Sequence, residues 1–105
     1  MLEKRNFYIN GKWTGPSKKN DFEVINPSNE EVFAIISLGD SADTNSAVEA
    51  AKKAFVNWKE ISKEERINFL EKLLKVYKKR FHEIAEAMSK EMGAPIDYAT
   101  SAHAM

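Results

Sequence analysis

Residues 47–58 decide the fold, and they read AVEAAKKAFVNW. Their apolar side chains recur every three to four residues, which is the spacing of one face of an amphipathic helix. That face comprises Ala47, Val48, Ala51, Ala54, Phe55 and Trp58. Its small alanines let a neighbouring element approach closely. The sequence therefore predicts a helix that begins near residue 41 and packs against another part of the protein.

The helical pattern continues downstream of residue 58. Ser62 and Glu65 have the spacing of a capping box, in which each side chain accepts a hydrogen bond from the other residue's backbone N–H. Two apolar stripes follow, one within residues 67–77 and one within residues 81–92. Gly93 comes directly after the second stripe and is predicted to end it in the left-handed conformation. Pro95 is then suited to the first position of a last helix.

The region upstream of residue 41 is predicted to form strands and turns. Asn10-Gly11 lies between two β-forming triplets, which is the strongest short signal for a hairpin with a type I′ turn. Residues 22–25 form a second β-rich stretch, and Asn26-Pro27 ends it because proline lacks a backbone N–H. Residues 32–36 are apolar without alternation, so we expect a strand with both faces covered.

These patterns predict an α+β protein, with a β-hairpin and short strands followed by three to four helices. Residues 1–40 are the strand segment and residues 41–105 the helical segment. The last helix has a start signal but no stop signal, and the helices are broadly apolar. We therefore expect an incomplete portion of a larger domain. A frayed natural C-terminus is the alternative.

The composition excludes several classes of function. The chain has 105 residues, no Cys, and 16 basic residues that balance 16 acidic ones. Without Cys it can form neither disulfides nor a thiol nucleophile. Its zero net charge gives no general attraction to nucleic acid or to an anionic membrane. No apolar run approaches the roughly 20 residues of a membrane span, and no secretory signal is visible, so we expect a cytoplasmic protein.

No catalytic constellation can be identified from the residues alone. The glycines lack the spacing of a dinucleotide-binding or phosphate-binding loop. His82 and His103 have no partners at metal-ligand spacing. Glu64-Glu65 falls in the first turn of a helix, where negative charge favours the helix dipole. The basic residues within 72–80 alternate with an apolar stripe, which indicates a solvated helix face rather than a nucleic-acid site.

The order of the motifs resembles that of the aldehyde dehydrogenase superfamily. Residues 7–13 (FYINGKW) resemble its opening INGxW segment, and residues 22–32 (FEVINPSNEEV) resemble its NPxxGEV turn. Residues 47–58 match its AVxAAxxAFxxW helix, residues 65–74 its next helix, and residues 91–96 (EMGAPI) its ExGxP junction. Together the five motifs extend over nearly the whole chain.

Two positions depart from this pattern. Asn29-Glu30 stands where a Thr-Gly pair is usual, and Ala94 stands where Lys is usual. The subfamily and the substrate therefore do not follow from these motifs.

The resemblance implies an oxidoreductase that uses NAD or NADP to convert aldehydes into carboxylic acids. In the family a cysteine thiolate attacks the aldehyde, hydride passes to the nicotinamide, and a glutamate helps water release the product. Those residues and the dinucleotide site lie further along the family's chain. The resemblance therefore implies that this chain is an incomplete N-terminal portion of the cofactor-binding domain, which by itself is inactive and binds no cofactor. It would pack against the rest of an aldehyde dehydrogenase that forms a homo-oligomer.

One site carries over in part from the resemblance. Some family members hold a monovalent cation with main-chain carbonyls just before the Asn-Pro turn and with an acidic residue before the glycine of the ExGxP junction. The matching positions are Val24, Ile25 and Glu91. Oxygen ligands of this kind suit a hard cation. The alternatives are plain strand residues at Val24 and Ile25 and a solvated or capping carboxylate at Glu91.

A second hypothesis concerns the chain as a whole. It could act as a non-catalytic helical interaction module derived from the family, which buries its broad apolar helix faces by association.

Overall fold

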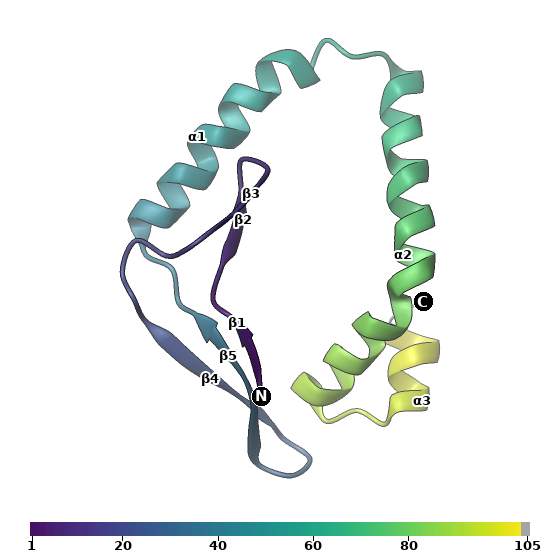
Figure 1. Cartoon of the computed structure of the whole chain (residues 1–105). Helices are drawn as coiled ribbons and strands as arrows, with labels where there is room; N and C mark the ends of the chain where they lie inside the picture. The colour runs from purple at the N-terminus through teal and green to yellow at the C-terminus, as the bar shows by residue number, and fades with distance from the viewer. Residues whose placement is uncertain (104–105) are drawn as a thin grey trace. The chain divides into compact units, whose positions relative to one another are not determined.

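The structure is a computed structural model, and it describes residues 1–103 (Figure 1). The strands are β1 (Leu2–Lys4), β2 (Phe7–Ile9), β3 (Lys12–Thr14), β4 (Asp21–Asn26) and β5 (Glu31–Ser37). The helices are α1 (Ser41–Trp58), α2 (Lys63–Met92), α3 (Ile96–Tyr98) and the π-helical turn η1 (Ala99–His103). Short strands followed by helices confirm the predicted α+β class.

The larger sheet has the strand order β1-β5-β4. β1 runs parallel to β5, with Leu2 opposite Ala34. β5 is central, as its apolar sequence suggests, but only Ala34 and Ser37 within it are buried, at 6% and 7% exposure. β1 is not among the strands predicted from the sequence. Its three residues include two charged ones and are too few to show a period.

The predicted hairpin is present as the antiparallel pair β2 and β3. Asn10 and Gly11 both have positive φ angles, 55° and 74°, as a type I′ turn requires. The facing residues Tyr8 and Trp13 meet edge to face, with ring centroids 5.2 Å apart. The sequence thus defines this element through local turn chemistry alone.

Helix α1 begins where the pattern predicts, but its cap differs from the usual Ser/Thr–Glu form. The Asp43 N–H donates to Asp40 Oδ1 at 3.1 Å, and the Asp40 N–H donates to Asp43 Oδ2 at 3.0 Å. Ser17 joins this capping box through its hydroxyl, which donates to Asp40 Oδ2 at 2.6 Å. The loop before β4 is therefore fastened to the first turn of α1.

Helix α2 is one continuous helix of 30 residues, so both apolar stripes lie on a single element. Ser62 caps it through its hydroxyl, which accepts from the Glu65 N–H at 3.1 Å. Of the predicted capping box the structure shows this bond and not the return bond from the Ser62 N–H to the Glu65 side chain. Gly93 ends it with φ 72° and ψ 12°, which confirms the predicted left-handed position. The segment that follows is helical from Ile96, so Pro95 is the N-cap of α3 rather than its first helical residue as predicted. Residues 104–105 of the predicted last helix lie outside the described residues.

Two compact units make up the chain. One contains Met1–Val24 and Val32–Ile61, and the other contains Ile25–Glu31 and the residues from Ser62 onward. In the second unit Ala85 and Ala99 are completely buried, and four half-buried apolar residues pack on them: Phe81, Ile84, Met88 and Ala94. The change from strand to helix falls between Ser37 and Ser41, close to the predicted boundary at residue 40. The two compact units do not follow that boundary, because residues 25–31 belong to the unit that contains α2.

Candidate functional site

The turn after β4 is closed by its own side chains. The side-chain oxygen of Asn26 accepts hydrogen bonds from the Ser28 N–H at 2.9 Å and from the Ser28 hydroxyl at 2.7 Å. The Asn26 carbonyl accepts from the Glu30 N–H at 2.8 Å. Glu30 has a φ of 60°, a left-handed conformation at the position where the resembled family usually has glycine. Glu30 thus adopts a left-handed conformation although it is not glycine.

This turn packs against the end of α2. A Cβ atom added to Gly93 would lie 3.0 Å from Pro27 Cγ and 3.5 Å from the Ser28 backbone nitrogen. Just beyond, the Ser89 hydroxyl donates to the Ala94 carbonyl at 2.6 Å and holds the chain as it leaves the helix. Two motifs more than 60 residues apart in sequence are thus in contact.

Each of the three candidate cation ligands lies two or three residues before one of the two residues in this contact. Ile25 belongs to the same compact unit as Glu91, whereas Val24 is grouped with the other unit. Ile25 is 52% exposed at the end of β4, and Glu91 is exposed in the last turn of α2. Whether these residues bind a cation stays a prediction.

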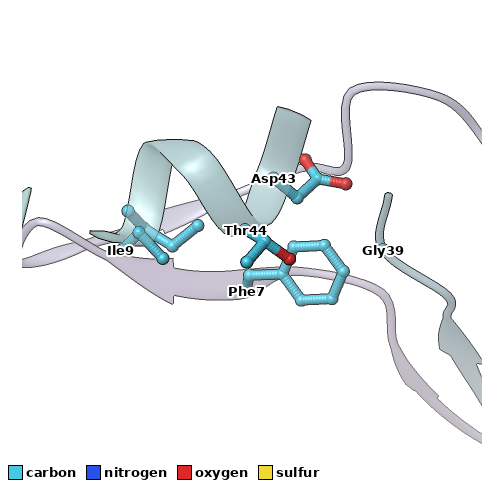
Figure 2. Close-up of a pocket in the computed structure, with 6 residues that line it drawn as sticks. Phe7, Ile9, Gly39, Asp43 and Thr44 are labelled. Carbon is cyan, nitrogen blue, oxygen red and sulfur yellow. The ribbon is translucent and has the colours of Figure 1, made fainter. Parts of the chain in front are cut away.

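A pocket of the first unit lies between the hairpin and α1, as Figure 2 shows. Its volume is about 270 Å³, and it is lined by Phe7, Ile9, Gly39, Asp43, Thr44 and Ala47. The Asp43 carboxylate accepts from the backbone N–H groups of Asp40 and Ser17, so it is engaged in capping. The pocket is therefore a packing site for apolar groups and gathers no catalytic pair.

Outside this pocket, the ring contact of His82 is also structural. His82 packs its ring on Phe81 with centroids 4.0 Å apart. Among residues 1–103, no three His, Cys, Asp or Glu side chains come close enough together to hold a metal ion. Within the same residues, no helix combines the length and apolar character of a membrane span. A cation site built from main-chain carbonyls does not require such a cluster of side chains.

The ionisable group that stands out is Asp40. The Ser17 hydroxyl, followed by the Asp43 N–H, holds the pKa of the Asp40 carboxyl below its ordinary value of 3.8. The roles of Asp40 and Ser17 were not predicted from the sequence. The spacing Asp40-x-x-Asp43 just before an apolar helix pattern is the signal that could have identified the cap.

Comparisons with known proteins agree with the order of these elements. The model of the aldehyde dehydrogenase family matches residues 13–105. A 3-succinoylsemialdehyde-pyridine dehydrogenase of a Pseudomonas species is 41% identical over 96 residues, which cover 91% of this chain and 20% of that protein.

Two crystal structures of aldehyde dehydrogenases superimpose closely on the chain. The enzyme from Bartonella henselae has a TM-score of 0.97 and 53% identity, covering 99% of this chain and 22% of its own. A point variant of aldehyde dehydrogenase C from Pseudomonas syringae, in complex with NAD+ and octanal, has a TM-score of 0.90 and 38% identity, covering 92% of this chain and 20% of its own.

The chain therefore spans about a fifth of the length of these relatives, including the two that are 41% and 53% identical to it. The matched part is the N-terminal region of those enzymes. The family match includes both motifs that meet at Pro27 and Gly93. This chain belongs to the aldehyde dehydrogenase family.

Proposed function

We propose that this chain is the N-terminal part of an NAD- or NADP-dependent aldehyde dehydrogenase, an oxidoreductase that converts an aldehyde into a carboxylic acid. The observation that carries this proposal is the superposition on the Bartonella henselae enzyme over 99% of the chain, with a TM-score of 0.97. The Pseudomonas syringae complex with NAD+ and octanal supports a nicotinamide cofactor and an aldehyde substrate.

The chain's own contribution is to the scaffold. With no Cys it supplies no thiolate to attack an aldehyde, and its glycines form no dinucleotide-binding loop. The nucleophile, the general base and the cofactor site would come from the remaining four fifths of the enzyme. We expect the 105-residue chain by itself to be inactive and to bind neither NAD nor NADP.

The amount of exposed surface supports a role for this chain as part of a larger protein. The chain has an accessible surface of 8569 Å². A compact protein of this mass would expose about 6,000 Å², and two compact bodies of half the mass about 7,200 Å² together. Apolar side chains contribute to the surplus, since Leu70 and Leu73 of α2 are each 64% exposed and Phe55 of α1 is 58% exposed. The partner that would cover these faces is the rest of the dehydrogenase.

The monovalent-cation site is part of the same proposal. The main-chain carbonyls of Val24 and Ile25 and the carboxylate of Glu91 are hard oxygen donors, and the Glu91 side chain is exposed at the end of a helix. The residues therefore fit a cation such as K+ or Na+. The ion would neutralise the carboxylate and tie the end of β4 to the end of α2.

The test is to clone and express the reading frame that contains this chain and to follow reduction of NAD+ and NADP+ with octanal and shorter aldehydes. We expect aldehyde-dependent formation of the reduced nicotinamide, and none from the 105-residue chain. A purified, folded full-length protein that reduces neither cofactor with any aldehyde would contradict the proposal. Sedimentation of the same protein tests the proposed homo-oligomer, and cell fractionation tests the proposed cytoplasmic location.

The comparisons do not favour the alternative of a stand-alone interaction module, because the similarity covers the chain as a continuous part of much longer enzymes. Saturable NAD+ binding by the isolated chain, at micromolar concentration, would contradict the division of roles proposed above.

A further inference from the structure

One face of the hairpin is turned towards helix α1. Ile9 lies opposite Lys12 in the antiparallel pair, and facing residues of such a pair project to the same side of the strands. Tyr8 and Trp13, one residue along each strand, project to the other side. β2 contacts α1 (Figure 1), and Ile9 and Lys12 line a pocket together with residues of that helix. The side of the hairpin that carries Ile9 and Lys12 therefore meets α1.

Helix α1 contributes a row of side chains to this pocket. Ser46, Glu49, Ala50 and Lys53 are spaced three or four residues apart, so they share one face of the helix. The pocket between this face and the hairpin has a volume of about 290 Å³. Its apolar part includes Ala50 of α1 and Ile9 of the hairpin, and both are half-buried. The structure thus brings polar side chains from two distant segments around an apolar base.

These polar side chains are not engaged elsewhere in the chain. Within residues 1–103, the side chains of Lys12, Ser46, Glu49 and Lys53 form no hydrogen bond or ion pair. Glu49 and Lys53 have the spacing at which a helix commonly forms an ion pair, yet the two remain apart. In the pocket of Figure 2, by contrast, the Asp43 carboxylate is occupied by backbone N–H groups. The pocket around Lys12 therefore has donors and an acceptor available for a ligand.

The charges around the pocket define the kind of ligand that it fits. Each lysine ammonium offers three hydrogen-bond donors and no acceptor, so Lys12 and Lys53 favour an oxyanion. The Glu49 carboxylate accepts hydrogen bonds only, so it favours a ligand that also carries a hydroxyl group. The volume lies at the lower end of the range of about 300–1,000 Å³ that is usual for small-molecule sites. Together these properties indicate a small anion with at least one hydroxyl group.

We propose that the pocket between the hairpin and α1 is a binding site for a small hydroxylated oxyanion, either a phosphate monoester or a carboxylate. Lys12 and Lys53 bind the anionic group, the Ser46 hydroxyl donates to it, and Glu49 accepts from the hydroxyl group of the ligand. All of these residues belong to the first compact unit. The inference therefore goes beyond the proposed function and needs no residue from the rest of the enzyme.

The experiment is isothermal titration calorimetry of the full-length protein that contains this chain, at low ionic strength. The probes are glycerol 3-phosphate and glycerate, with glycerol as the uncharged control. We expect saturable binding of at least one of the two anions and none of glycerol, and the anion that binds more tightly identifies the preferred group. Lys12→Ala and Lys53→Ala should each weaken this binding about tenfold or more, because each removes a charge-assisted hydrogen bond. Lys52→Ala, which removes the same charge from an exposed neighbouring position that does not line the pocket, should change it less than about twofold.

A further variant tests the role of Glu49. Glu49→Ala should reduce, about fivefold or more, the preference for the hydroxylated anion over its plain counterpart, which is inorganic phosphate or acetate. An unchanged preference would contradict this role of Glu49. If the folded protein binds neither anion saturably, or if Lys52→Ala weakens binding as much as the two pocket variants do, the site itself is wrong. Circular dichroism confirms that each variant is folded, and aldehyde oxidation by the same samples tests the proposed function separately.

Discussion

The Ser17 hydroxyl donates a 2.6 Å hydrogen bond to Asp40 Oδ2, and this bond joins the loop after β3 to the cap of α1. The backbone N–H of Ser17 extends the connection by donating to Asp43 Oδ1 at 2.9 Å. Ser17, 23 positions upstream of Asp40, thus forms part of the cap of α1, the helix that defines the fold.

Ser17→Ala should lower the thermal midpoint of the full-length protein, because Asp40 loses a hydrogen-bond donor and the loop loses its attachment. Asp40→Ala should lower it further, since it also removes the helix cap. Differential scanning calorimetry measures both. In the double variant the effect of Ser17→Ala should largely disappear, and full additivity would contradict the shared network.

The lowered pKa of Asp40 predicts acid sensitivity at this cap. A carboxyl whose pKa is lower in the folded than in the unfolded state contributes stability above its unfolded pKa, and that contribution is lost as the pH falls through the folded value. We therefore expect the contribution to be complete at neutral pH and to fall below the ordinary value of 3.8. Asp40→Asn should make the thermal midpoint less dependent on pH in the acidic range. An unchanged pH profile would contradict this assignment.

Ala85→Leu should destabilise the helical unit by about 1–3 kcal/mol, because a larger side chain must be inserted where no surface is exposed. Ala87→Leu is the matched control, since it makes the same change two residues along α2 at an exposed position. Urea unfolding of the full-length variants measures the difference. Equal effects of the two substitutions would show that Ala85 does not lie in the core.

Ser62→Ala should cost about 1 kcal/mol, the usual loss when an N-cap hydroxyl is removed. The lost bond is the one from the Glu65 N–H to the Ser62 hydroxyl, 3.1 Å long. Lys63→Ala at the next position leaves that bond intact and should have little effect. A synthetic peptide of residues 60–80 provides the measurement, with helix content followed by circular dichroism.

Local chemistry explains what could be predicted from the sequence. Asn10-Gly11, Ser62 and Gly93 each determine the backbone of their own immediate neighbours, and the structure confirms all three. β1 was missed because its pairing with residues 34–36 depends on a distant segment and leaves no pattern within Leu2–Lys4.

The candidate site shows the same limit. Every residue has a main-chain carbonyl, so the candidate carbonyl ligands at Val24 and Ile25 carry no sequence signature and were proposed only by resemblance. The contact between Pro27 and Gly93 is long-range and could not be read from either motif alone. Its tightness follows from packing in three dimensions, which spacing does not encode.

The parallel pairing of β1 with β5 has a consequence for the order of events during synthesis. The hairpin of β2 and β3 needs only residues 7–14 and can close as soon as they leave the ribosome. The first strand must wait until Ala34, Ile35 and Ile36 have emerged, because they are its hydrogen-bonding partners. Residues 2–4 are therefore translated before the hairpin but join their sheet only after it.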